Sequence, residues 1–405
     1  MTDVITTRTE KLLDEADQYG ASNYKPLPVV LERGEGVWVW DVDGKRYLDM
    51  LSAYSALNQG HRHPSILEAA EEQLGRITLT SRAFHNDQMG PFLKELCELT
   101  GYEKALPMNT GAEAVETALK MVRKWGYTRK GIPQDEAEII VCENNFHGRT
   151  TTIVGFSSEP QYRAGFGPFP KGFRMIPYGD ADALAAAITD RTAGFLVEPI
   201  QGEGGVIIPA DGYLARVAEI CKARRVALMA DEIQTGLGRT GRMFCADWEG
   251  VRPDVLIIGK ALGGGVYPVS AALADAELMD VFTPGDHGST FGGNPLGAAV
   301  ARASLKVIVD EDLPARADAL GRWFMEQLRR IDSPHVLEVR GKGLMVGVEI
   351  RESSGPARPF CEALQERGIL AKETHGQVIR FAPPLIIERS TLEDALEDIE
   401  AVLVN

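Results

Sequence analysis

The chain has 405 residues, of which 44% are apolar and 25% charged, a composition typical of folded globular proteins rather than disordered, collagen-like or coiled-coil chains. Its 43 basic and 58 acidic residues give a net charge of −15, which repels nucleic-acid phosphates and anionic lipid. We therefore expect neither a nucleic-acid nor a membrane partner. The length favours two or three domain-sized units, or one large domain with a smaller one.

The cysteines and the first residues bear on the cellular compartment. The five cysteines are an odd number and widely spaced, and they include no Cys-x-x-Cys pair, which is typical of reduced thiols. The start of the chain lacks the basic-then-apolar plan of a secretory signal, and no apolar run reaches the roughly 18 residues that a membrane helix needs. These features predict a cytoplasmic protein.

In chain order, the expected elements begin with a hairpin, because alternating residues at 37–40 and 45–48 flank an Asp-Gly pair. Short and nearly continuous apolar runs follow, with helical patterns at 112–127 and 212–225 between them. Such runs suit strands buried on both faces, and their alternation with helices predicts an α/β core with a parallel sheet. The expected strands are 138–141, 193–197, 226–230, 254–258 and 269–274.

The C-terminal part of the chain reads as a smaller unit of mixed helices and strands. No linker, repeat or low-complexity tract separates it from the rest, so we expect one compact body. A long helix is expected at 295–310, before this unit. The expected elements of the unit itself are a helix at 313–331, strands at 336–339 and 344–350, another helix, a strand at 378–381 and a last helix that ends at Val404.

Lys260 is the first candidate catalytic residue. It follows the expected strand at 254–258 and precedes a glycine-rich run. A lysine at a buried strand end is easily desolvated, which lowers the pKa of its amine and makes it a nucleophile toward an aldehyde. The alternative interpretation is a surface lysine whose stem lies along apolar residues.

Asp231 ends the expected strand at 226–230. If the two strands are neighbours, Asp231 and Lys260 meet at the carboxyl edge of the sheet, where ligands of open α/β sheets bind. A buried carboxylate needs a cationic partner, and a protonated pyridine nitrogen would serve. A helix cap or a magnesium ligand is an equally good interpretation of Asp231 alone.

Two stretches are typical of phosphate binding. Gly111 and Ala112 stand at the start of a helix, where free N–H groups and the helix dipole attract phosphate. Ser289 and Thr290, in a glycine-rich stretch, could also reach a phosphate. Ordinary helix capping and a flexible loop are the alternatives.

Other patterns favour no further site. The third glycine within 341–347 stands one residue late for a dinucleotide-binding motif, and no P-loop or Gly-x-Ser-x-Gly elbow occurs. His61 and His63 have no third ligand nearby, so we expect no metal.

An aldehyde-reactive lysine, a pyridinium partner and a phosphate seat together indicate pyridoxal 5'-phosphate, and the sequence resembles the class III aminotransferases over nearly its whole length. The most specific stretches are 51–60, 78–84, 198–203, 230–236 and 259–262. The resemblance implies an α/β protein of PLP-dependent transferase fold type I, with a mostly parallel, seven-stranded-type sheet and a smaller α+β domain. It implies an N-terminal segment at 1–50 that joins the small domain, a large cofactor-binding domain at 51–305 and a C-terminal small domain at 306–405.

The resemblance also implies roles at the cofactor. Lys260 would hold the cofactor covalently and shuttle a proton, and Asp231 would pair with the pyridinium. Gly111 and Ala112 would donate N–H groups to the phosphate. Ser289 and Thr290 would contribute from the partner subunit of a homodimer or higher oligomer. The remaining contacts would be Phe146 in front of the ring, Ile233 behind it, Gln234 at the ring hydroxyl, and His147.

Within the family, the chain most resembles members that move the terminal amino group of L-ornithine to 2-oxoglutarate, giving glutamate and glutamate 5-semialdehyde, which cyclises to pyrroline-5-carboxylate. Arg380 would clamp the α-carboxylate of glutamate, and Glu203 would cover Arg380 when ornithine is bound. Arg149 would hold the distal carboxylate, Tyr24 and Tyr54 would shape the ornithine end, and Glu198 is expected among the substrate-binding residues.

One departure from the pattern of the ornithine members leaves a second substrate as an alternative. His147 follows Phe146 where the ornithine members carry tryptophan, and Phe-His-Gly-Arg is common among acetylornithine and 4-aminobutyrate relatives. Acetylornithine or another ω-amino acid is therefore the alternative, whereas Tyr54 and Tyr24 favour ornithine. Outside the family, the alternatives are a nicotinamide oxidoreductase and a non-catalytic binding protein.

Overall fold

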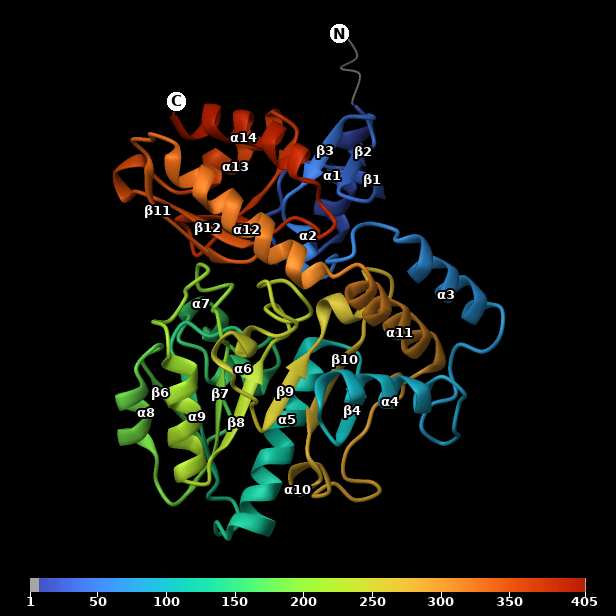
Figure 1. Ribbon diagram of the computed structural model, residues 1–405, viewed down its shortest axis with the longest axis vertical. Helices are drawn as coiled ribbons and strands as arrows, with labels where there is room; N and C mark the ends of the chain where they lie inside the picture. Colours follow the sequence, from blue (N-terminus) through green and yellow to red (C-terminus); the bar gives the residue numbers. More distant parts are fainter. Residues whose placement is uncertain (1–6, 405) are drawn as a thin grey trace.

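The larger part of the molecule is built on a seven-stranded sheet, in the lower half of Figure 1. The computed structural model describes residues 7–404. All neighbouring strands are parallel except that β10 runs antiparallel to both β9 and β4, so the mostly parallel sheet is confirmed and the run at 269–274 is its antiparallel member. In sheet order, the strands are β4 (Lys104–Met108), β10 (Ser270–Ala274), β9 (Val255–Ile258), β8 (Ala227–Asp231), β7 (Thr192–Val197), β5 (Glu138–Cys142) and β6 (Phe173–Ile176).

The two faces of this sheet bury different residues of the same strand. In β5, Ile139 and Val141 join the apolar cluster under one layer of helices, whereas Ile140 and Cys142 join the cluster under the other. Because both faces are covered, nearly every residue of a central strand is apolar, which explains the continuous runs in the sequence. The covering helices are α5 (Gly111–Trp125) and α10 (Ala276–Met279) on one face, and α8 (Ala181–Ala187) and α9 (Tyr213–Ala223) on the other.

The remaining helices of the larger part lie beside the sheet or in its connections. The long helix α11 (Pro295–Asp310) packs against α3 (Pro64–Leu74) and α4 (Met89–Thr100). Within residues 7–404, no helix is both long and apolar enough to cross a lipid bilayer. The shorter helices are α6 (Thr151–Gly155), α7 (Pro160–Arg163), η1 (Gly126–Lys130), η2 (Cys245–Glu249) and η3 (Lys260–Gly263).

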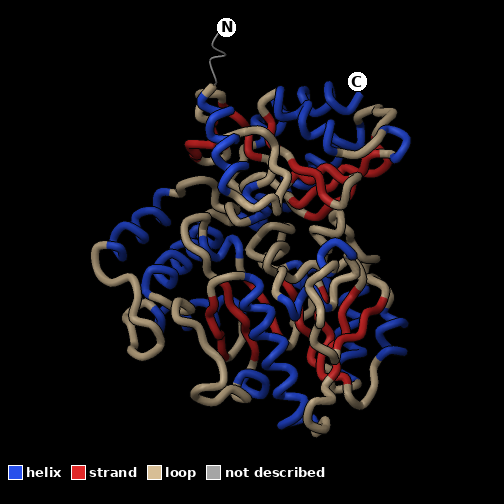
Figure 2. Tube along the Cα trace, turned by 180° about the vertical axis from the view of Figure 1, so that it is seen from behind, coloured by secondary structure: helices blue, strands red, loops and turns tan. Residues whose placement is uncertain are grey.

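The smaller part combines residues from both ends of the chain, and Figure 2 shows its strands from behind, above those of the larger sheet. An antiparallel sheet has the order β11 (Val336–Lys342), β12 (Met345–Ile350), β15 (Val378–Phe381) and β14 (Lys372–Thr374). A second sheet has the order β1 (Leu31–Glu35), β2 (Trp38–Asp41), β3 (Arg46–Asp49) and β13 (Ile369–Leu370), in which β3 and β13 pair in parallel.

The remaining helices are α1 (Arg8–Tyr19), α2 (Ser52–Ser55), α12 (Leu313–Arg330), η4 (Glu352–Ser354), α13 (Arg358–Glu366) and α14 (Arg389–Val404). Of these, α12 and α13 pack against the strands of the two smaller sheets, α14 packs on α12 and α13, and α2 contacts η3 of the larger part. The two terminal segments expected from the sequence also include residues 1–6 and 405, which lie outside the described residues.

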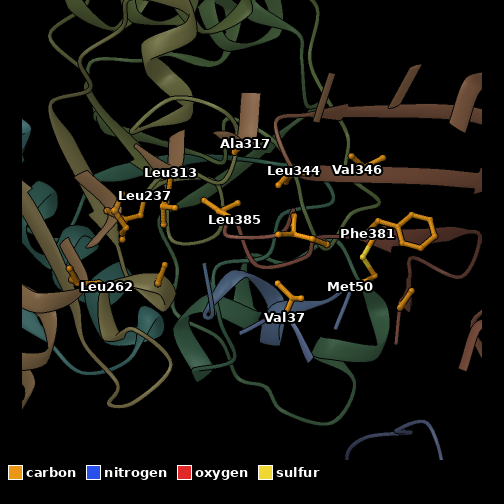
Figure 3. Close-up of a cluster of buried hydrophobic side chains, with 14 of the residues drawn as sticks. Val37, Met50, Leu237, Leu262, Leu313, Ala317, Leu344, Val346, Phe381 and Leu385 are labelled. Atoms are coloured by element: carbon orange, nitrogen blue, oxygen red, sulfur yellow. The ribbon is translucent and has the colours of Figure 1, made fainter. Parts of the chain in front are cut away.

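One hydrophobic cluster crosses between the two parts (Figure 3). Val37 and Met50 of the N-terminal segment lie in it with Phe381 of β15, and Leu237 and Leu262 of the larger part belong to the same cluster. None of these side chains is more than 9% exposed. Separating the parts would expose this close-packed core to water, so burial of these side chains holds the two parts together.

Candidate active site

Lys260 and Asp231 follow two neighbouring parallel strands to the same edge of the sheet. Asp231 is the last residue of β8 and lies opposite Ile257 of β9, and Lys260 comes directly after β9 and Gly259. Both residues line one cavity of about 210 Å³. The predicted meeting of Lys260 and Asp231 at the carboxyl edge is therefore confirmed.

The surroundings of Lys260 favour a nucleophilic amine. Its backbone lies in the left-handed region, with φ 45°, an uncommon conformation for a residue with a side chain and one that clusters at functional sites. Burial lowers the pKa of the Lys260 amine, and the nearby carboxylates of Glu203 and Asp231 offset this only in part. A larger share of the amine is therefore uncharged, which is the form that attacks an aldehyde.

Asp231 is anchored by His147. Oδ2 of Asp231 lies 2.7 Å from Nδ1 of His147, and Oδ1 accepts the Ile233 amide at 3.1 Å. Burial lowers the pKa of His147, but the hydrogen bond and the charge of Asp231 outweigh it, so the pKa is raised overall. The raised pKa favours a protonated imidazole beside the buried carboxylate, which would otherwise be uncompensated.

The N-terminus of α5 has two backbone N–H groups to offer. A capping box occupies its neighbours: Thr110 accepts the Glu113 amide, and Glu113 accepts the amides of Asn109 and Thr110. Within residues 7–404, the amides of Gly111 and Ala112 have no hydrogen-bond partner, at the positive end of the helix dipole. This arrangement suits a phosphate group.

The residues of this cavity fit pyridoxal 5'-phosphate. Lys260, whose pKa is lowered, can react with the aldehyde of the cofactor, and the buried carboxylate of Asp231 can face the ring nitrogen. The free amides at the start of α5 can bind the phosphate. An added Cβ at Gly111 would lie 3.0 Å from Cδ1 of Ile233, a tight contact, so the glycine lets the start of α5 and Ile233 lie close together. The expected residues that line the cavity are Gly111, Ala112, Phe146, His147, Glu198, Glu203, Asp231, Ile233, Gln234 and Lys260.

Glu198 is a buried carboxyl group in the wall of this cavity. Its Oε1 accepts the Phe146 amide at 2.9 Å. Burial raises the pKa of Glu198 to about 8, and the charge of His147 counters this only in part. Glu198 is therefore mostly uncharged at neutral pH. It lies in the cavity of Lys260, away from the larger cavity lined by Tyr24 and Tyr54.

Arg380 is a buried cation whose N–H donors are only partly used by hydrogen bonds to the described residues. Its Nη1 donates to Oε1 of Glu203 at 2.7 Å, and its Cζ lies 4.8 Å from the centre of the Tyr54 ring. Its Nε and Nη2 have no hydrogen-bond partner among the described residues. Burial raises the pKa of Glu203, but the charge and hydrogen bond of Arg380, with smaller contributions from Lys260 and Gln234, together outweigh it, so the pKa is lowered overall. A buried guanidinium with two unpaired N–H donors is suited to bind a carboxylate.

A second cavity, of about 1210 Å³, brings together the other substrate candidates, Tyr24, Tyr54 and Arg149. The Cζ atom of Arg149 lies 4.3 Å from the ring centre of Tyr162 and 5.6 Å from that of Phe146.

Tyr54 belongs to a run of four residues, 52–55, that all have positive φ. This strained turn holds the Tyr54 ring over Arg380. Tyr162 was missed from the sequence, because no periodicity or motif marks the residues around it.

Ser289 and Thr290 are not brought to the cavity of Lys260 within the same chain. They line a separate pocket with Ser81 and Arg82, and the Ser289 hydroxyl accepts a hydrogen bond from the side-chain Nδ2 of Asn109 at 2.8 Å.

The two histidines considered as metal ligands have carboxylate partners instead. His61 pairs with Asp49 at 2.8 Å, and His63 pairs with Glu311 at 2.9 Å. Across residues 7–404, no three His, Cys, Asp or Glu side chains gather as a metal ion would require.

Comparison with known proteins places this site in a family. Residues 19–403 match the family described as "Aminotransferase class-III". An ornithine aminotransferase of Brevibacillus brevis is 57% identical over 397 residues, which are 98% of this chain and 99% of that protein. The structure of the ornithine aminotransferase from Toxoplasma gondii, which has PLP at partial occupancy in its active site, matches with a TM-score of 0.97 and 47% identity over 98% of this chain and 95% of the other. An acetylornithine aminotransferase from Elizabethkingia anophelis matches with a TM-score of 0.89 and 48% identity over 98% and 99% of the two chains. The chain therefore belongs to the class-III aminotransferases, which are pyridoxal-phosphate-dependent enzymes.

Proposed function

We propose that this enzyme is an ornithine aminotransferase, which moves the terminal amino group of L-ornithine to 2-oxoglutarate by a ping-pong mechanism and gives glutamate and glutamate 5-semialdehyde. The observation that carries the proposal is the buried Arg380, paired with Glu203 on one side and with two free N–H donors on the other. One pocket must accept ornithine by its terminal amine and then 2-oxoglutarate by its α-carboxylate. A cation with a removable carboxylate partner meets both demands.

Pyridoxal phosphate, when bound, supplies the aldehyde and the electron sink of the reaction. Lys260 would hold the cofactor and would act as the base that carries the proton removed from the substrate carbon. Asp231, fixed by His147, stabilises the proton on the ring nitrogen. Gly111 and Ala112 bind the phosphate through their amides.

The residues proposed to bind substrate differ in the charge of the substrate group that each of them contacts. Glu203 neutralises Arg380 while ornithine reacts, so the ornithine end that carries no carboxylate is not placed against a bare cation. When 2-oxoglutarate or glutamate enters, its α-carboxylate displaces Glu203 and takes the free donors of Arg380. Arg149 holds the distal carboxylate, and Tyr24 and Tyr54 shape the ornithine end.

We further propose a cytoplasmic homodimer or higher oligomer, without nucleic-acid or membrane partners, in which Ser289 and Thr290 reach the phosphate of the neighbouring subunit's site. Their separate pocket supports this, because neither residue lines the cavity of its own chain's Lys260. The proposed domains are residues 1–50, 51–305 and 306–405, and the second boundary falls inside α11. The parallel pairing of β3 with β13 supports joining the N-terminal segment to the C-terminal domain.

The decisive experiment compares kcat/KM for ornithine, N-acetylornithine and 4-aminobutyrate, with 2-oxoglutarate as the acceptor. We expect kcat/KM for ornithine to exceed the values for the other two substrates by at least about tenfold, because the proposed pocket matches the free amino and carboxylate groups of ornithine. N-acetylornithine as the best substrate would instead favour the alternative, which is supported by His147 and by the similarity to the acetylornithine enzyme. A Glu203→Ala variant should lose ornithine turnover relative to glutamate turnover.

A further inference from the structure

Glu203 lies in a short backbone hairpin, residues 201–207, whose position decides where its carboxylate points. Gln201 and Ile207 exchange backbone hydrogen bonds of 3.1 and 3.0 Å. Gly205, with φ 113°, adopts a conformation that favours glycine. An added Cβ at Gly202 would overlap Gln234, so the hairpin packs directly on the site.

Arg340 of β11 holds the far side of this hairpin. Its Nε donates to the carbonyl oxygens of Gly205 at 3.2 Å and Val206 at 3.0 Å, and its Nη2 donates to the Gly205 oxygen at 2.7 Å. Its Nη1 donates to the carboxylates of Glu338, at 2.8 Å, and Glu349, which fix the guanidinium from behind. The Arg340 side chain is only 12% exposed, so water competes weakly for these hydrogen bonds.

The same antiparallel sheet provides three further contacts to the hairpin. Thr374 of β14 donates from its hydroxyl to the Glu203 carbonyl at 2.8 Å, and Arg380 of β15 holds the Glu203 carboxylate. Val206 is fully buried and packs against Gly347 of β12, where an added Cβ would come within 3.1 Å of it. Because one sheet carries all of these residues, it fixes the distance between the hairpin backbone and Arg380.

We infer that Arg340 is a positioning residue that sets substrate selection, because its grip on Gly205 and Val206 keeps the Glu203 carboxylate against Arg380 until a substrate carboxylate displaces it. This inference rests on the proposed function, in which Glu203 leaves Arg380 for 2-oxoglutarate and returns for ornithine. A looser hairpin makes the displacement easier and the return less complete. Loss of Arg340 therefore favours α-carboxylate ligands over ornithine.

The test is the Arg340→Gln variant as holoenzyme, with Arg340→Lys as the conservative variant. Arg329→Gln is the matched control, because Arg329 of α12 donates from Nε and Nη2 to the carbonyl of Val339, the neighbour of Arg340 in β11, at 3.2 and 3.1 Å, and has no hydrogen bond to residues 201–207 among the described residues. Two quantities are measured. The first is the specificity constant of each half-reaction, with ornithine and with glutamate, followed by absorbance. The second is the Kd for glutarate, an unreactive dicarboxylate, measured by calorimetry.

We expect Arg340→Gln to lower the ornithine-to-glutamate ratio about tenfold and to tighten glutarate binding about threefold, since it removes several charge-assisted hydrogen bonds from the hairpin. Arg340→Lys should restore part of both values, and Arg329→Gln should leave both as in the wild type. Equal losses in the two half-reactions with an unchanged glutarate Kd would overturn the inference. If Arg340→Gln does not fold, the same two quantities in Arg340→Lys decide. A wild-type enzyme inactive on ornithine refutes the proposed function, while the glutarate measurement still tests Arg340.

Discussion

Nδ1 of His147 lies 2.7 Å from Oδ2 of Asp231, in a pair whose side chains are 1% and 5% exposed. Burial lowers the pKa of His147, yet the hydrogen bond and charge of Asp231 raise it beyond the ordinary value. Nε2 of His147 has no hydrogen-bond partner among the described residues, so Asp231 is the principal anchor of this ring. The pair places a compensated carboxylate in the wall of the cofactor cavity, and each member depends on the other.

Replacing His147 by phenylalanine should destabilise the protein and weaken cofactor binding. The change leaves Asp231 buried without its cation, so we expect the free energy of unfolding of the apoprotein to fall by about 3 kcal/mol and the Kd for pyridoxal phosphate to rise at least about tenfold. Urea unfolding and an absorbance titration measure the two effects. His63→Gln, which removes a histidine paired with the more exposed Glu311, should cost less than about 1 kcal/mol. Unchanged cofactor affinity in His147→Phe would contradict this role.

Lys260→Ala should reduce transamination by at least about 10³-fold, because it removes both the nucleophile and the proton carrier. Borohydride reduction of the wild-type holoenzyme followed by peptide mapping should label Lys260. Lys130 is the internal control: burial lowers its pKa as well, but it donates to the Thr192 carbonyl at 2.6 Å and does not line the cavity. Label on Lys130 in place of Lys260 would refute the assignment.

Glu198 should make the protein less stable as the pH rises from 4.5 to 8. Burial raises its folded-state pKa to about 8 from an ordinary value of 4.5, so across this window the unfolded chain releases a proton that the folded protein keeps. The contribution of this group to the free energy of unfolding therefore falls by about 1.4 kcal/mol per pH unit.

Glu198→Gln removes that titration and should become more stable than the wild type toward pH 8. Urea midpoints of the apoproteins between pH 5 and pH 8 test this, with the exposed Glu393→Gln as the control that should follow the wild-type profile. Parallel profiles for the wild type and Glu198→Gln would show that Glu198 does not titrate in this range.

Arg239→Met should lower the free energy of unfolding by about 3 kcal/mol or more, because it leaves several buried oxygens without a donor. Arg239 is fully buried, and burial lowers its pKa to about 9. The exposed Arg242→Gln, which loses only a contact over Trp248, should change stability by less than about 1 kcal/mol when both variants are unfolded in urea. Equal stability of the two variants would contradict the structural role of Arg239. Its acceptors, at 2.7–3.0 Å, are Leu344 O, Pro383 O, Ser52 Oγ and Asn58 Oδ1.

Much of the fold could be predicted, because buried strands and amphipathic helices leave local patterns. The hairpin of β2 and β3, the central strands and the helices α11, α12 and α14 were all expected near their observed bounds. Strands β4, β6, β13 and β14 were not, since they are two to five residues long and lack a continuous apolar run. The antiparallel direction of β10 was also hidden, because a strand buried on both faces looks the same in either direction.

The candidate site, like the fold, could be predicted from the sequence only in part. Lys260 and Asp231 were expected together because each follows a buried strand, and the carboxyl ends of parallel strands share one edge. The residues that hold the Glu203 hairpin were not expected. Thr374 and Arg340 reach the Glu203 hairpin from a sheet more than 130 residues further along the chain, and no periodicity encodes such contacts.

By itself, the sequence determined the chemistry of this protein: a desolvated lysine, an acid on the neighbouring strand and a glycine at a helix start are local features, and their types and order suffice to indicate the cofactor. Only the tertiary structure decided which groups hold that chemistry in place. His147 and Asp231 are 84 positions apart, and Glu203 and Arg380 are 177 apart. The first pair forms where two segments of the larger part meet, and the second forms where the smaller part packs on the larger one; in both, tertiary packing brings the side chains within hydrogen-bond distance in a largely buried region.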